Sequence, residues 1–221
     1  MNPRIGVKLA PRVDQIGEFL ADVRALDASG VAALWVEGDE DPWLLLAAAS
    51  VVTSRMKLVA PCSAAEVDAP DRLARRVATL QLLAHHRVVL CVDDAAFVEP
   101  VLACGDAPLL FDVQAGAPPV AATAVVRAAR GWLLPGRVPA DLRTDRDAVL
   151  AARRAQELDL GLEFWAGVPV PAGRAEWRRS LAEQLAAGAT GVVVPHDPRL
   201  LDLLRNPDSD GNRSDLQLAQ G

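Results

Sequence analysis

Short apolar runs alternate with helix-period segments along nearly the whole chain. The runs are rich in Val, Leu and Ile and fall at residues 5–9, 31–36, 56–60, 88–92, 109–113, 131–134, 162–166 and 191–194. Because they are continuously apolar rather than strictly alternating, they are typical of parallel strands that are covered on both faces. The pattern therefore predicts eight strands separated by helices.

The segments between the runs carry apolar stripes with helical spacing. Three of these stripes are the clearest: Ile16, Phe19, Leu20, Val23 and Leu26 in the first segment, Leu73, Val77, Leu80 and Ala84 in the third, and Trp177, Leu181 and Leu185 in the seventh. Each stripe can cover a pair of neighbouring strands, so we expect the helices to lie outside the sheet.

Helix starts are indicated by capping residues. In Asp41-Pro42 and Asp197-Pro198, an N-cap aspartate precedes a proline at the first helical position. The stretch from Thr144 to Asp147 resembles a capping box. These signals predict helix starts near residues 42, 145 and 198.

Helix ends are indicated by glycine and delayed by proline. Gly30, Gly161 and Gly188 stand just before the second, seventh and eighth runs, where a glycine closes a helix. Pro118-Pro119 interrupts the segment between the fifth and sixth runs, so that helix is expected to start late, near Val120.

Eight strand-helix units favour a closed (β/α)8 TIM barrel, compact and with short loops, over an open doubly wound sheet. No Gly-rich phosphate-binding fingerprint follows the first run, as an open dinucleotide-binding sheet would require. The chain of 221 residues lies in the size range of one barrel, which we assign to residues 1–205. Residues 206–221 are polar and turn-rich and are expected to form a disordered tail.

Composition narrows the classes of partner. A net charge of −6 argues against a nucleic-acid partner, because phosphate binding depends on basic patches. No apolar stretch approaches the roughly 20 residues of a membrane span, and no signal peptide opens the chain. Cys62, Cys91 and Cys104 show neither metal-ligand spacing nor an even disulfide count. We therefore expect a cytoplasmic protein.

Candidate chemistry lies just beyond each strand, because barrel active sites occupy the carboxyl ends of the strands. Around the predicted ring these residues are Lys8 and Arg12, Glu37, Asp39 and Glu40, Cys62 and Ser63, Asp93 and Asp94, Asp112 and Gln114, Arg137, Glu163 and Trp165, and His196 and Asp197. The predicted mouth of the barrel is therefore rich in carboxylates.

Among these residues His196 is the best-placed base, since imidazole titrates near neutrality. Asp93 and Asp94 could hold a divalent cation together with Glu37 or Asp112, but nothing resembles the His-x-His pair of metal-dependent barrel hydrolases. We therefore predict no metal site. Cys62 has no base paired with it in the sequence, which disfavours a thiolate nucleophile.

Several segments, in the right order, resemble the luciferase-like monooxygenase family. They are residues 25–37 with Leu34-Trp35-Val36, residues 41–58 with Asp41-Pro42, residues 70–88 with His86-Arg87-Val88, residues 126–133 with Gly131-Trp132, and residues 177–194. Members of that family are flavin- or deazaflavin-dependent oxidoreductases on a (β/α)8 barrel.

The resemblance implies an oxidoreductase or monooxygenase that uses FMN or coenzyme F420 on a small-molecule substrate. On the predicted mouth, the candidate catalytic residues are His196 and Glu37, and the candidate cofactor-binding residues are Lys8, Cys62, Ser63, Asp93, Gln114 and Arg137. The resemblance and the apolar stretch at residues 43–49 also favour a homodimer, or a heterodimer with a homologue.

A second function remains open at this point. The family usually has a glycine-rich turn after the fourth strand, where this chain has Cys91-Val92-Asp93-Asp94-Ala95-Ala96. The alternative is a non-catalytic barrel that has lost its cofactor loops and serves as a binding protein or partner subunit.

Overall fold

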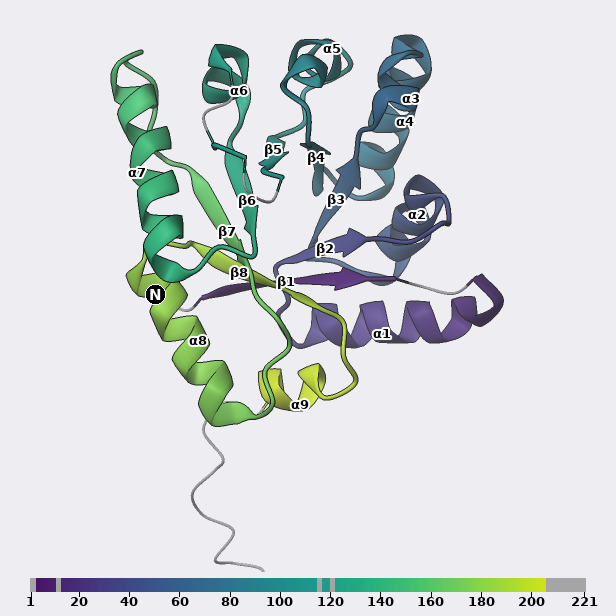
Figure 1. Ribbon diagram of the computed structural model, residues 1–221. Helices are drawn as coiled ribbons and strands as arrows, with labels where there is room; N and C mark the ends of the chain where they lie inside the picture. The colour runs from purple at the N-terminus through teal and green to yellow at the C-terminus, as the bar shows by residue number, and fades with distance from the viewer. Residues whose placement is uncertain (1–2, 11–12, 115–116, 120–121, 206–221) are drawn as a thin grey trace, which may run out of the picture.

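The computed structural model describes residues 3–10, 13–114, 117–119 and 122–205, and it forms a closed barrel of parallel strands (Figure 1). The strands follow one another around the barrel in chain order: β1 (Arg4–Leu9), β2 (Ala33–Val36), β3 (Lys57–Pro61), β4 (Val88–Val92), β5 (Leu109–Asp112), β6 (Gly131–Pro135), β7 (Glu163–Gly167) and β8 (Gly191–Pro195). The barrel closes where β1 pairs with β8, with Arg4 opposite Gly191 and Val7 opposite Val194.

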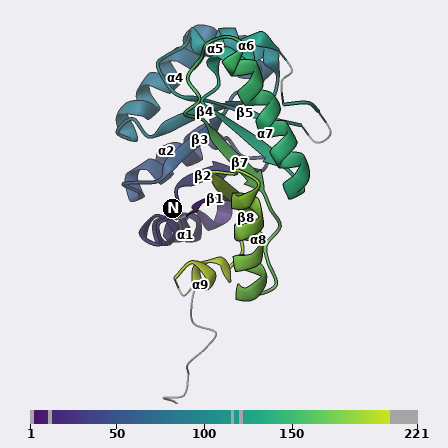
Figure 2. The same cartoon turned by 90° about the vertical axis from the view of Figure 1, so that its left-hand side faces the viewer.

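Helices surround the strands on the outside of the barrel, as both views show (Figures 1 and 2). They are α1 (Ile16–Ala28), α2 (Pro42–Val52), α3 (Ala64–Val67), α4 (Pro70–Leu83), α5 (Val98–Leu102), α6 (Thr123–Ala128), α7 (Pro139–Arg154), α8 (Arg174–Ala186) and α9 (Leu200–Arg205), with 3-10 turns η1 (Val13–Gln15) and η2 (Ala95–Phe97). The predicted (β/α)8 TIM barrel is confirmed, and each strand begins within two residues of its predicted start.

Three of the predicted helix boundaries are confirmed in detail. The Asp41 carboxylate caps α2 by accepting hydrogen bonds from the backbone N–H groups of Trp43 and Leu44, at 2.9 and 3.3 Å. Gly30 and Gly188 follow α1 and α8 with φ of 86° and 97°, the left-handed conformation that glycine adopts without strain.

Three predicted boundaries are wrong. Thr144 lies inside α7 and donates its hydroxyl to the Ala140 carbonyl at 3.1 Å, because the helix already starts at Pro139. Glu157, with φ of 55°, makes the left-handed turn after α7 that was assigned to Gly161. Asp197 caps a turn by accepting from the Arg199 N–H at 2.8 Å, and α9 begins only at Leu200.

The start of α6 falls three residues after the predicted position, at Thr123. Val120 itself lies outside the described residues, as does the predicted tail at residues 206–221.

The barrel interior is filled by side chains from seven of the strands. They are Ala33, Trp35, Val59, Val89, Cys91, Leu110, Leu133, Trp165 and Val193. The rings of Trp35 and Trp165 meet edge to face, with centroids 5.5 Å apart and an interplanar angle of 73°. A larger apolar layer between strands and helices forms the second part of the core.

The two indole rings need glycine on the neighbouring strands. A Cβ at Gly6 would lie 2.5 Å from Trp35 Cζ3, and one at Gly191 would lie 2.7 Å from Trp165 Cζ3. Each glycine therefore supplies the space into which a tryptophan ring packs, and the interior is closed to any sizeable ligand.

The amino-terminal end of the barrel is closed by an ion-pair cluster centred on Glu163, the first residue of β7. Its carboxylate pairs with Arg4, the first residue of β1, and with Lys57, the first residue of β3, at 2.7 Å for Lys57. It also accepts the Trp165 indole N–H at 3.1 Å. The placement of Glu163 and Trp165 at the mouth is therefore wrong: Glu163 lies at the opposite end and Trp165 inside the barrel.

We expect Gly6→Ala to lower the free energy of unfolding by about 1–3 kcal/mol, because the new methyl group overpacks against the Trp35 ring. Urea denaturation measures the change. Gly17→Ala is the matched control, because a Cβ at Gly17 in α1 meets nothing within 4 Å. If both variants show the same stability, the interior is not packed as tightly as described.

Candidate functional site

Four charged side chains form one layer at the carboxyl ends of the strands, directly above the filled interior. Each stands two residues after a position that faces the barrel interior, which is Gly6, Trp35, Cys91 or Leu110. Because successive side chains of a strand alternate between its two faces, each of the four also faces the barrel axis. We call this set the mouth layer: Lys8 on β1, Glu37 after β2, Asp93 after β4 and Asp112 at the end of β5. The layer holds one cation and three carboxyl groups.

Two of the three carboxylates in the mouth layer have hydrogen-bond donors. Lys8 Nζ lies 2.6 Å from Glu37 Oε1, which makes a salt bridge across β1 and β2. The Gln114 side-chain amide lies 3.4 Å from Asp93 Oδ2. The structure thus brings together four of the predicted site residues, Lys8, Glu37, Asp93 and Gln114.

The third carboxyl group, that of Asp112, is half-buried and accepts no hydrogen bond from the described residues. Burial raises the pKa of Asp112 to about 6; the charge of Lys8 lowers it, and those of Asp93 and Glu37 raise it further. A carboxyl group with this pKa can both accept and donate a proton near neutral pH.

Cys91 lies beneath the mouth layer as part of the filled interior. Burial raises the pKa of its thiol well above the ordinary value, and the charge of Asp112 acts in the same direction. Cys91 therefore stays a neutral thiol, and it packs rather than reacts.

A pocket of about 430 Å³ opens beside the mouth layer. It is lined by Asp93, Asp94, Ala95, Phe97, Phe111, Gln114, Ala117 and Pro118. Its volume lies within the range of small-molecule sites, and its lining combines aromatic surface with a few polar groups, as such sites do. Asp94 also caps η2 by accepting the Ala96 N–H at 2.8 Å.

Arg137 lies behind this pocket rather than in it. Its Nε donates to Asp145 Oδ2 of α7 at 2.7 Å, and its Nη2 donates to the carbonyl of Ala117, a wall residue, at 2.5 Å. Only 15% of its side chain is exposed. Arg137 therefore links the pocket wall to α7. Its Nε and Nη2 atoms both donate to protein groups rather than into the pocket.

His196 lies on the outer side of the barrel. Its Nε2 is 3.8 Å from Asp22 Oδ2 on α1, and its side chain has the same strand parity as Val192 and Val194, which pack against the helices. His196 thus faces α1, away from the mouth layer.

Cys62 and Ser63 also lie apart from the mouth layer. Cys62 is buried in the outer apolar core, where burial raises the pKa of its thiol to about 12. Ser63 precedes α3, and both its backbone N–H, at 3.0 Å, and its hydroxyl bind Glu66 Oε2. Both residues contribute to local structure.

The sequence placed Asp112 at the predicted mouth but gave it no role beyond that of an alternative metal ligand. One signal could have raised it: Asp112 is the polar end of an apolar strand and stands two residues after the interior residue Leu110. Among the described residues, no group of three or more His, Cys, Asp or Glu side chains is placed to hold a metal ion. Within the same residues, no helix is both long and apolar enough to cross a membrane.

No protein-family model and no curated protein sequence matches the chain. Solved structures do. An F420-dependent secondary alcohol dehydrogenase, in complex with an F420-acetone adduct, has a TM-score of 0.74 at 11% identity, over 94% of this chain and 98% of that one. The coenzyme F420 dependent tetrahydromethanopterin reductase from Methanopyrus kandleri has a TM-score of 0.69 at 13% identity, over 92% and 96%.

The monooxygenase RslO1 from Streptomyces bottropensis has a TM-score of 0.62 at 17% identity, over 83% of this chain and 77% of that one. At 11–17% identity these likenesses show the fold alone: all three proteins share the barrel of this chain.

The raised pKa of Asp112 makes the effect of Asp112→Asn on stability depend on pH. A folded-state pKa raised from 3.8 to about 6 costs wild-type stability as the pH rises from about 4 to about 6. Asp112→Asn removes this cost, so it should raise the free energy of unfolding by about 1–3 kcal/mol at pH 7 to 8 and give no gain near pH 4.

Urea denaturation at several pH values measures this difference. Asp106→Asn, at an exposed position before β5, is the control and should show no pH-dependent gain. A gain of Asp112→Asn that stays constant between pH 4 and 8 would show that Asp112 titrates normally.

Proposed function

We propose that the chain is an oxidoreductase that binds FMN or coenzyme F420 at the barrel mouth and acts on a small-molecule substrate. The observation that carries the proposal is the likeness of the barrel, over nearly the whole of both chains, to two F420-dependent oxidoreductases. Monooxygenases among the similar structures support the same general kind of chemistry.

The lining of the pocket beside the mouth layer fits the ring of such a cofactor better than its phosphate. Phe97 and Pro118 offer apolar surface to a planar ring, and Gln114 offers an amide at its edge. Lys8 is the cation of the mouth layer and is already paired with Glu37. We therefore expect the ring in this pocket, and we expect a phosphate that enters the mouth with it to be repelled by the carboxylates of the mouth layer.

The proposed roles follow from these positions. When bound, the flavin or deazaflavin supplies the ring that exchanges a hydride. Lys8 and Glu37 hold each other in place beside the ring, and Asp93 and Gln114 line its pocket. Because Asp112 titrates near neutrality, it is the group in the mouth layer best suited to take or give a proton.

Four of the residues predicted for the site fit it less directly. Arg137 acts through the pocket wall, and His196, Cys62 and Ser63 lie outside the mouth layer. We assign the catalytic role of a base to Glu37 or Asp112 rather than to His196. The non-catalytic alternative is not favoured, because the similar oxidoreductases match the barrel from end to end. The three cysteines are free and buried, in keeping with the proposed cytoplasmic location.

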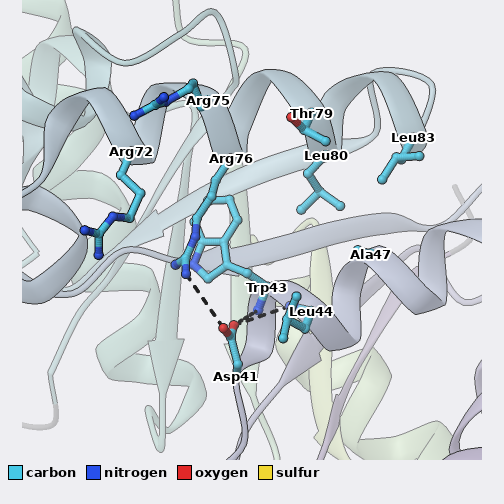
Figure 3. A pocket seen from close by; sticks show the side chains of 10 residues that line it. All are labelled: Asp41, Trp43, Leu44, Ala47, Arg72, Arg75, Arg76, Thr79, Leu80 and Leu83. Carbon is cyan, nitrogen blue, oxygen red and sulfur yellow. Dashed lines mark hydrogen bonds and ion pairs between the residues drawn. The ribbon is translucent and has the colours of Figure 1, made fainter.

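We also propose that the chain associates with a second copy through a groove between α2 and α4. The groove has a volume of about 280 Å³ and is lined by Asp41, Trp43, Leu44, Ala47, Arg72, Arg75, Arg76, Thr79, Leu80 and Leu83 (Figure 3). Arg76 lies 3.8 Å from the Asp41 carboxylate, so an ion pair lies beside the apolar side chains of Trp43, Leu44 and Leu80.

Large aliphatic side chains are exposed on these two helices. Leu44 and Val51 on α2 are 70% and 77% exposed, and Leu82 and Leu83 on α4 are 71% and 47% exposed. These four are half of the large hydrophobic side chains that are exposed among the described residues. An exposed apolar surface of this kind marks an association site, and a two-fold axis would place Leu44 of each copy over the groove of the other.

The cofactor proposal is tested by titrating the purified protein with FMN and with coenzyme F420 while following the absorbance bands of each ring. Perturbed bands and saturable binding of either one are expected. Unchanged spectra with both at high micromolar protein would reject the proposal.

Asp93→Asn with Asp94→Asn should tighten FMN about tenfold at low salt. Like charges ~8 Å apart repel by roughly 2 kcal/mol at an effective dielectric near 20, and 1.4 kcal/mol corresponds to tenfold. Asp106→Asn with Glu183→Gln is the control, because it removes two exposed carboxylates away from the pocket. Equal gains in both double variants would place these aspartates away from the cofactor.

Leu44→Glu should convert a dimer into a monomer, because it buries a charge in the proposed interface. Light scattering across a concentration series measures the mass. Leu102→Glu on α5, which is 39% exposed, is the control and should remain dimeric. A monomeric wild type, or a dimeric Leu44→Glu variant, contradicts the proposed interface.

A further inference from the structure

The charges of the mouth layer are unbalanced. Lys8 is the only cation of the layer and is 2.6 Å from Glu37, so its charge is already matched. Asp93 and Asp112 remain, and the charges of Lys8, Asp93 and Glu37 all act on Asp112. An anionic ligand that enters the mouth therefore meets repulsion unless one carboxylate becomes neutral.

Asp112 is the carboxylate that can become neutral most easily. Glu37 accepts a hydrogen bond from the Lys8 ammonium, and Asp93 accepts one from the neutral Gln114 amide, whereas Asp112 accepts none from the described residues. Hydrogen bonds to a carboxylate favour its ionised form, so their absence at Asp112 leaves burial to favour its neutral form. Asp112 is also half-buried, while Asp93 is exposed.

We propose that binding of an anionic ligand at the barrel mouth is coupled to the uptake of one proton by Asp112. The ligand class is a phosphate-bearing or otherwise anionic molecule, and the inference rests on the site assigned under the proposed function. The ligand brings negative charge into the mouth. Asp112 takes a proton from solvent at the same time and so loses its own negative charge. The mouth therefore gains one negative charge fewer than the ligand carries.

The other groups that face Asp112 set the direction of the coupling. Lys8 from β1 favours ionised Asp112, whereas Glu37 after β2 and Asp93 after β4 favour the protonated form. Cys91 of β4 stays a neutral thiol and contributes no charge. A bound anion adds to the effect of Glu37 and Asp93, so the complex holds the proton at a higher pH than the free protein does.

This coupling has a measurable consequence for affinity. Above the pH at which free Asp112 loses its proton, each binding event must bring a proton from solvent, so the affinity falls by up to tenfold per pH unit. Between pH 7 and 8.5 we expect the Kd for FMN to rise at about that rate for the wild type. Riboflavin carries no phosphate and should show little pH dependence.

Calorimetry of FMN binding in two buffers of different ionisation enthalpy, HEPES and Tris, counts the protons taken up. We expect an uptake approaching one proton for the wild type at pH 7.5, and an uptake near zero for Asp112→Asn with a Kd that is flat in pH. Asp106→Asn should behave as the wild type. An Asp112→Asn variant with wild-type proton uptake, or wild-type FMN binding without uptake, overturns the inference.

A second measurement separates failure of the inference from failure of the proposed function. The carboxyl carbon of Asp112 is followed by NMR across pH in the free protein and with inorganic phosphate as the probe, and is assigned by its absence in Asp112→Asn. A titration midpoint that rises with phosphate supports the coupling even if FMN fails to bind, in which case only the cofactor proposal is rejected. A midpoint near that of an ordinary aspartate, or one that phosphate leaves unchanged, overturns the coupling.

Discussion

The edge-to-face contact between Trp35 and Trp165 is the constraint on which the rest of the barrel depends. Two indole rings occupy the interior of a small barrel, and they fit only because Gly6 and Gly191 leave room beside them. With its interior filled, the barrel has no space for a ligand between the strands. Any chemistry must therefore take place on the layer of side chains immediately above the rings, which is the usual place for it in this fold.

The two ends of the barrel shift the pKa of a half-buried carboxyl group in opposite directions. At the amino-terminal end, Glu163 lies between Arg4 and Lys57; burial opposes its ionisation, but these cations lower its pKa. At the carboxyl end, Lys8 is the one cation of the mouth layer, beside its three carboxyl groups. Here burial raises the pKa of Asp112, whereas the pKa of Glu163 is lowered. The first arrangement stabilises the ionised state and closes the barrel. The second leaves a group poised to change its charge, as functional sites commonly do.

The sequence was sufficient for the fold but only partly for the site. Continuous apolar runs located β4 to the residue, and Asp41 before a proline located the start of α2. The same continuity hides which face each side chain occupies, because strands covered on both sides do not alternate. Glu163 was predicted at the mouth although it stands at the start of the seventh apolar run, and the structure accordingly has it as the first residue of β7, at the opposite end. The parity of β8 turned His196 toward α1. Asp112 gained its importance only from burial and neighbouring charges, which depend on how four strands, β1, β2, β4 and β5, are staggered around the barrel.

The most direct test of the account is a crystal structure of the protein grown with coenzyme F420 or FMN at saturating concentration. We expect electron density for the ring over the mouth layer, against Phe97 and Pro118 and within reach of Lys8 and Asp112. Density for the ring in the groove between α2 and α4, or at the amino-terminal end beside Glu163, would contradict it.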